Sequence, residues 1–112
     1  MKLWSNDVRR ELELARQARS EGNEGRARVC ARRAGGIAAR EYLKLRGDPA
    51  SAASAYDLLN RLSNLADVPQ RARQSAVFLT MRVDEEFKLP EEVDLIAEAG
   101  VLCRTLHPGL EI

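Results

Sequence analysis

Apolar residues recur every three or four positions through five successive stretches of this chain, and glycine or proline follows each stretch. This spacing gathers apolar side chains along an α-helix, whereas a half-buried strand would need alternation at every second position. No stretch of the sequence alternates in that way. Ala, Leu, Arg and Glu are abundant and aromatic residues make up only 4%, which favours helix over sheet. The sequence therefore predicts an all-α fold.

The breaks divide the chain into five expected helices, over about residues 5–21, 24–46, 51–65, 69–87 and 90–106. Short connections force neighbouring helices to run antiparallel. A chain of 112 residues is long enough for one hydrophobic core and has the size of a single domain. We therefore expect one domain over residues 1–112, folded as an up-and-down antiparallel bundle of four to five helices.

The second and fourth expected helices carry apolar residues on two sides. One strip of each helix suits a bundle core, and the other holds the candidate interface residues Val29, Gly36, Leu43, Val77, Phe78 and Met81. A helix that is apolar on two sides is either central in a bundle or part of an interface between chains. We therefore expect a homodimer through these residues. The alternative is that the strips face each other within one chain.

Two adjacent glycines, Gly35 and Gly36, stand in the middle of the second expected helix. Each costs about 1 kcal/mol of helix propensity relative to alanine. Close packing of a neighbouring helix is the simplest compensation for this cost. We therefore expect the substitution Gly36→Leu to disrupt folding or assembly.

The formal net charge is only +1, but the charges are unevenly spread. Residues 1–47 hold 12 Lys or Arg against 6 Asp or Glu, a net of +6, and residues 48–112 hold 6 against 11, a net of −5. Arg26, Arg33, Arg40 and Lys44 lie within a narrow arc of the second expected helix. Such a row suits a phosphate backbone, so these four are candidate nucleic-acid-binding residues. One alternative is that the row is simply a solvated helix face, because it lacks aromatic residues that stack bases. The other is that the opposite charges of the two halves neutralise each other between antiparallel helices.

The sequence has no phosphate-binding glycine loop, dinucleotide fingerprint or zinc spacing, so we expect no cofactor and no metal site. The single histidine, His107, follows Arg104 by three positions near a chain end, where fraying is common. Such a pair suits metal-independent RNA cleavage, since His moves a proton while Arg holds the phosphate. The alternative is that both are cations that suit a helix C-terminus.

Two further groups, the acidic clusters and the two cysteines, allow either a functional or a purely structural interpretation. Acidic residues cluster at 84–86 and at 91–94, where they either hold a divalent cation or complement a helix N-terminus. Cys30 and Cys103 fall on apolar helix faces and form no metal motif, so we expect buried, reduced thiols.

The chain lacks the signals that direct a protein into or across a membrane. No run approaches the ~20 apolar residues of a membrane span. The first 13 residues carry charges throughout, unlike a signal peptide with its apolar centre. We therefore expect a cytoplasmic protein without membrane contact.

Two segments of the sequence carry a family resemblance. An alanine-rich stretch, RVCARRAGGIAAREYL at 28–43, is followed by a glycine-containing loop and by SAYDLLNRL at 54–62. Over about residues 5–106, this pattern resembles the HEPN family (higher eukaryotes and prokaryotes nucleotide-binding). The resemblance implies a helical bundle that often dimerises. It also implies either a small nucleotidyltransferase as partner or ribonuclease activity, since many members have one or the other.

The ribonuclease members of that family carry an arginine, then four to six residues, then a histidine. Here only two residues separate Arg104 from His107, no histidine follows Arg82 at that distance, and Tyr56 stands where many members have histidine. We therefore expect a non-catalytic HEPN-like binding module, a homodimer that engages a protein partner, for example a nucleotidyltransferase, or nucleic acid. One alternative is a metal-independent ribonuclease that uses Arg104 and His107. Another is a purely structural subunit of a larger assembly.

Overall fold

The computed structural model describes residues 3–82 and 92–112, and every regular element within these two ranges is helical. The all-α prediction is therefore confirmed. The elements are α1 (Leu3–Ser20), α2 (Glu24–Leu45), the short 3-10 turn η1 (Pro49–Ala52), α3 (Ala55–Ser63), α4 (Gln70–Leu79) and α5 (Leu95–Leu106).

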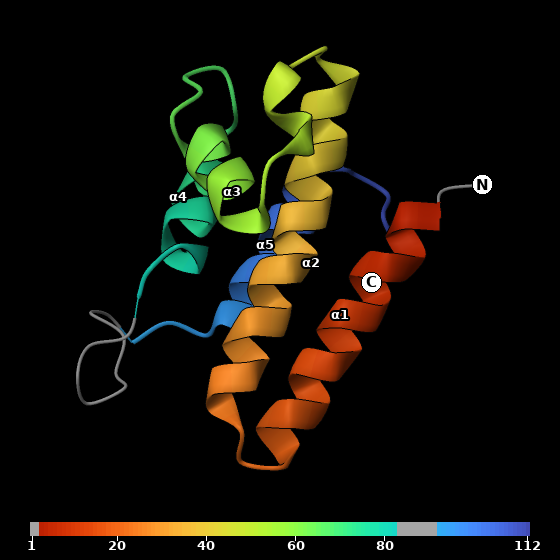
Figure 1. The fold of residues 1–112 in the computed structure, drawn as a ribbon, viewed down its shortest axis with the longest axis vertical. Coiled ribbons are helices and arrows are strands. Elements are labelled where there is room, and N and C mark those ends of the chain that lie inside the picture. The colour runs from red at the N-terminus through yellow and green to blue at the C-terminus, as the bar shows by residue number, and fades with distance from the viewer. Residues whose placement is uncertain (1–2, 83–91) are drawn as a thin grey trace.

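Helix α2 is the centre of the fold, because it packs against each of the other four α-helices. The long helices α1 and α2 form an antiparallel hairpin, α5 lies behind α2, and the shorter α3 and α4 pack together on the other side of α2 (Figure 1). Most apolar residues of α2 thus have neighbours within the same chain, as expected of a central helix, although Val29 and Leu45 stay exposed.

Two helix boundaries differ from those expected between α4 and α5. Helix α4 ends at Leu79 rather than at residue 87, and α5 begins at Leu95 rather than at residue 90. The Thr80 hydroxyl donates to Val77 O at 2.9 Å, and Arg32 Nε donates to Leu79 O at 2.7 Å. The Thr80 hydroxyl thus adds a second hydrogen bond to Val77 O, which also accepts from the backbone N–H of Thr80, and Arg32 bonds the last carbonyl of the helix. The remainder of the expected fourth helix, residues 83–87, lies outside the described part of the chain.

The start of α5 is fixed by the carboxylate of Asp94. One oxygen accepts hydrogen bonds from the backbone N–H groups of Ile96 and Ala97, and Arg19 of α1 donates to the same oxygen at 2.9 Å. Burial alone would raise the pKa of Asp94, but the hydrogen bonds from Arg19 and Ala97 outweigh burial and lower it. Asp94 therefore caps α5 and ties it to the end of α1.

The side of α2 that faces the core consists largely of small residues. Five alanines of this helix are completely buried: Ala27, Ala31, Ala34, Ala38 and Ala39. Leucines from the surrounding helices fill the space that the alanines leave, and Leu59, Leu79 and Leu102 are also completely buried. Small residues let these helices approach α2 closely, which gives the interior its density.

The closest approach lies at Gly36, where α3 begins. A Cβ atom on Gly36 would lie 2.5 Å from Ala55 Cβ and 2.9 Å from Ala55 Cα. Gly36 and Leu43, expected at an interface between chains, are both buried within this chain, and Leu43 has no exposed surface. These two residues are therefore not available for an interface between chains, because α3 and the rest of the core already cover them.

A first prediction concerns the contact between Gly36 and Ala55. The new methyl group of Gly36→Ala would push the start of α3 away from α2. We therefore expect this substitution to lower the free energy of unfolding by about 1–3 kcal/mol, and Gly36→Leu to lower it further. Gly25→Ala is the matched control in α2, since only Asn23 Oδ1, at 3.9 Å, lies near its new Cβ. Chemical denaturation measures both. Equal stability of Gly36→Ala and Gly25→Ala would contradict the close contact.

Candidate functional site

His107 is a buried residue at the C-terminal end of α5, with only 8% of its surface exposed. Its Nε2 atom lies 2.9 Å from the carbonyl oxygen of Ala38 in α2. Because a carbonyl only accepts hydrogen bonds, Nε2 carries the proton and donates. The imidazole also contacts Trp4 of α1, with ring centroids 4.5 Å apart, and Tyr42 of α2 at 6.3 Å. The ring thus joins α1, α2 and α5.

Arg104, the other half of the candidate catalytic pair, lies on the surface. Its guanidinium group covers Gly100, with Nη2 3.2 Å from the position that a Cβ would occupy there. His107 borders a pocket of about 330 Å³ with Trp4, Glu41 and Lys44, and Arg104 is not among the residues that line it. The geometry therefore gives His107 a packing role and does not bring Arg104 and His107 to a common pocket.

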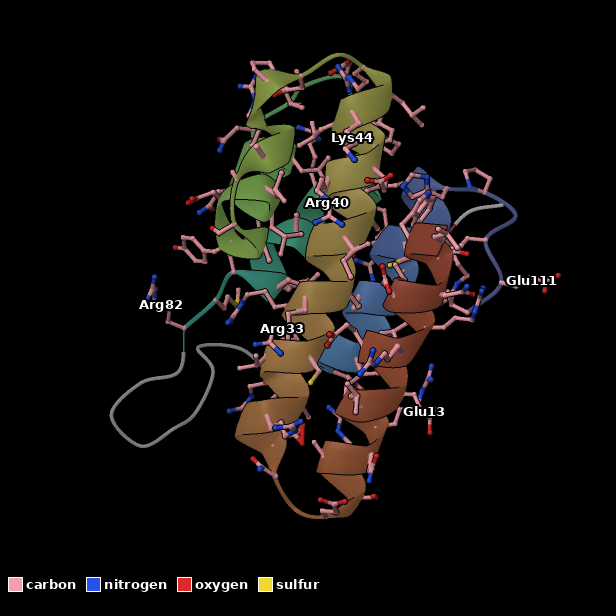
Figure 2. All side chains as sticks on the ribbon, turned by 45° about the vertical axis from the view of Figure 1, so that its right-hand side comes forward. Glu13, Arg33, Arg40, Lys44, Arg82 and Glu111 are labelled. Atoms are coloured by element: carbon pink, nitrogen blue, oxygen red, sulfur yellow. The ribbon has the colours of Figure 1, made fainter. Side chains whose placement is uncertain are left out.

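The four candidate nucleic-acid-binding residues stay at the surface as a row along α2. Arg33, Arg40 and Lys44 follow one face of the helix, between α3 and α1 (Figure 2). Arg26 and Arg33 are exposed. Arg40 and Lys44 both lie beside Glu41, with nitrogen–oxygen distances of 3.6 Å and 3.3 Å, and their side chains remain 39% and 57% exposed. We call these four residues the arginine row.

A shallow groove lies at the middle of the arginine row, between α1, α2 and the start of α3. It has a volume of about 210 Å³ and is flanked by Arg33, Arg40 and Glu11. Glu11 Oε2 is buried and has no hydrogen-bond partner among the described residues. The groove has an apolar floor formed by Gly36, Ile37, Ala53, Ala55 and Leu58. The row thus combines exposed positive charge with a small apolar surface.

Both cysteines are buried and reduced, as predicted. Burial raises the pKa of the Cys103 thiol to about 12. Burial also raises the pKa of Cys30, and the negative charge of Glu11 acts in the same direction. Both thiols are therefore protonated at neutral pH, which suits packing rather than nucleophilic or metal chemistry.

The remaining candidate interface residues are divided between surface and interior. Val29 is 40% and Val77 is 47% exposed, whereas Phe78 and Met81 are partly buried. Leu45, the last residue of α2, is 82% exposed, and none of the other helices in the described part of the chain buries it. The exposed apolar surface of the chain thus differs from the predicted strip.

A polar cluster that the sequence did not indicate joins α2, α3 and the segment after α4. Arg32 of α2 donates to Leu79 O at 2.7 Å and to Met81 O at 3.4 Å. The Arg82 guanidinium lies 4.9 Å from the centre of the Tyr56 ring in α3. The expected fourth helix placed Arg82 within a helix, so no sequence pattern brought it next to Arg32 and Tyr56.

The acidic residues considered for a divalent cation fall largely outside the described ranges, which exclude Asp84, Glu85, Glu86 and Glu91. Asp94 is described and serves as the cap of α5 and a partner of Arg19. Within residues 3–82 and 92–112, no group of three or more His, Cys, Asp or Glu is placed to hold a metal ion.

Comparisons with protein families, with curated proteins and with solved structures find no match to this chain. Among the helices of the described part of the chain, none combines the length and apolar character that crossing a bilayer requires.

A second prediction separates packing from catalysis at His107. We expect His107→Ala to lower the free energy of unfolding by about 2–4 kcal/mol, because the ring contacts and the hydrogen bond to Ala38 are lost. Arg104→Ala is the surface control and should stay within about 0.5 kcal/mol of the wild type. Thermal and chemical unfolding measure both. A His107→Ala variant of wild-type stability would contradict the packing role.

Proposed function

We propose that this chain is a non-catalytic, HEPN-like helical binding module that binds single-stranded RNA through the arginine row of α2. The observation that carries the proposal is the exposure of this row on the central helix, with Arg26 and Arg33 turned to solvent. From Arg26 to Lys44 the row extends over about 27 Å of helix, which is long enough to follow several phosphates.

Several other arginines of the chain pair with a carboxylate, as Arg40 and Lys44 of the row do with Glu41, whereas no ion pair of Arg26 or Arg33 is found among the described residues. Arg46 pairs with Asp67, Arg61 with Asp48, and Arg71 with Glu98. Arg19 bonds both Glu24 and Asp94. Two of these pairings, Arg19 with Asp94 and Arg46 with Asp67, join the basic first part of the chain to its acidic second part. The basic excess is thus partly neutralised inside the fold, and the row is a portion of it that faces outward.

The non-catalytic part of the proposal follows from the position of His107. A general base must reach the proton that it removes, within hydrogen-bonding distance. The His107 Nε2–H is already donated to Ala38 O, and the ring packs against Trp4. A metal-independent ribonuclease that uses Arg104 and His107 would have only Nδ1 of this ring as its base, and Arg104 does not line the pocket that His107 borders.

A third prediction tests the arginine row by fluorescence anisotropy with a labelled single-stranded RNA. If all four cations contact phosphates, the slope of log K against log salt is about −3, and the double variant Arg26→Gln/Arg33→Gln reduces it to about −1.5. Arg10→Gln, an exposed arginine on α1, is the control and should keep the wild-type slope. The RNA should remain intact.

Three outcomes would contradict this proposal. Absence of binding at low salt, or equal slopes for the double variant and the control, would remove RNA as the ligand of the row and turn the search to an acidic protein partner such as a nucleotidyltransferase. Cleavage of the RNA that is lost in His107→Ala would establish the ribonuclease alternative instead.

We also propose that the module is a homodimer, because Val29 and Val77 leave large aliphatic side chains 40% and 47% exposed. A fourth prediction follows for the mass in solution. Light scattering on a sizing column should give twice the monomer mass of 12.5 kDa, and Val77→Asp should shift it toward the monomer. Leu3→Asp, at a side chain that is 65% exposed on α1, is the control and should leave the mass unchanged. A monomeric wild type would overturn the dimer.

A further inference from the structure

A cavity of about 640 Å³ lies where the turn between α1 and α2 meets the segment after α4. Its wall includes Arg28, Arg32 and Arg82, with Val29 and Met81 beside them. None of the four residues of the arginine row lines this cavity. Its volume is typical of sites for small molecules, which measure about 300–1,000 Å³.

The charge along this cavity is predominantly positive. Glu24 is the only acidic residue among those that line it in the described part of the chain. Arg19 lies outside the cavity wall and bonds Glu24 at 2.7 Å. Among the described residues of the wall, this one negative charge is matched by a neighbouring cation, and Arg32 and Arg82 present positive charge that favours an anion.

Arg32 is held in place before any ligand arrives. Its Nε donates to Leu79 O at 2.7 Å and its Nη2 to Met81 O at 3.4 Å, so the guanidinium cannot turn freely. Burial lowers the pKa of Arg32, and the nearby charge of Arg82 lowers it further. An anion placed between the two groups would relieve this repulsion, because its negative charge attracts both. Each guanidinium also offers N–H donors in a fixed plane that can bond the anion.

Arg82 is positioned by the aromatic ring of Tyr56. Its guanidinium carbon lies 4.9 Å from the ring centre, a cation–π arrangement. Hydrogen bonds from Asn60 and from Arg82 lower the pKa of the Tyr56 phenol. Two guanidinium groups, one from α2 and one from the segment after α4, are thus fixed at one cavity by separate contacts.

We propose that this cavity binds a small organic phosphate ester, with the phosphate between Arg32 and Arg82 and the organic group against Met81. Two guanidinium groups at one cavity suit the negative charge of a phosphate. The apolar side chains and the volume favour an ester over inorganic phosphate. Because the arginine row does not line the cavity, this inference stands independently of RNA binding.

A fifth prediction tests the cavity by isothermal titration calorimetry of the full chain with phenyl phosphate, inorganic phosphate and phenol. We expect phenyl phosphate to bind most tightly. Arg82→Gln should weaken both phosphates by about 10-fold to 100-fold, as expected for a lost charge-assisted hydrogen bond. Met81→Ser should weaken phenyl phosphate and leave inorganic phosphate unchanged. Arg10→Gln, away from the cavity, is the control and should bind as the wild type does.

Circular dichroism and melting temperatures show that each variant is folded before its binding is compared. The proposal is overturned if phenyl phosphate gives no binding at millimolar concentration, or if Arg82→Gln binds it as tightly as Arg10→Gln does. It is also overturned if Arg82→Gln weakens the binding of labelled RNA while phenyl phosphate does not compete with that RNA. The phosphate that Arg82 recognises would then belong to the polymer. Loss of RNA binding in Arg26→Gln/Arg33→Gln with phenyl phosphate binding intact would support two separate sites.

Discussion

The close approach of its neighbours to α2 is the constraint on which the rest of this structure depends. At Gly36 there is no room for a Cβ, because Ala55 Cβ would lie only 2.5 Å away. A Cβ at Gly35 would lie 2.8 Å from Leu79 Cδ1 and 3.2 Å from Leu102 Cδ2. The glycine pair thus weakens α2 as an isolated helix but lets α3, α4 and α5 approach it. Tertiary packing of this kind routinely outweighs helix propensity.

This central position of α2 also decides which side chains are left for binding. Its alanines and Leu43 are covered by other helices of the same chain. Arg32 points toward the end of α4 and bonds its carbonyls, whereas Arg33 lies exposed one position later. A single helix therefore supplies the packing centre, the arginine row and one of the two guanidinium groups of the proposed phosphate site, whose other guanidinium group belongs to Arg82 after α4. His107 belongs to the packing part, since its hydrogen bond ends on α2 at Ala38.

Much of the fold was predictable from the sequence because helical periodicity and the breaks are local signals. The small residues of 24–46 indicated a helix with close neighbours, and the contact of Gly36 with Ala55 confirms that reading. The end of α4 was not predictable, because it depends on Arg32, 47 residues earlier in the chain, bonding Leu79 O. The cluster of Arg32, Tyr56 and Arg82 escaped prediction for the same reason. For His107, spacing alone could not distinguish a surface acid–base group from a ring buried against Trp4.

We propose that α2 is the ligand-binding helix of a non-catalytic module, and nuclear magnetic resonance tests this proposal most directly. Backbone amide shifts of the isotope-labelled chain are followed while an unlabelled single-stranded RNA is added. We expect the amide resonances of the arginine row to shift, at Arg26, Arg33, Arg40 and Lys44, while the amide resonance of His107 stays unchanged. Shifts centred on Arg104 and His107, or no shifts along α2 at low salt, would contradict it.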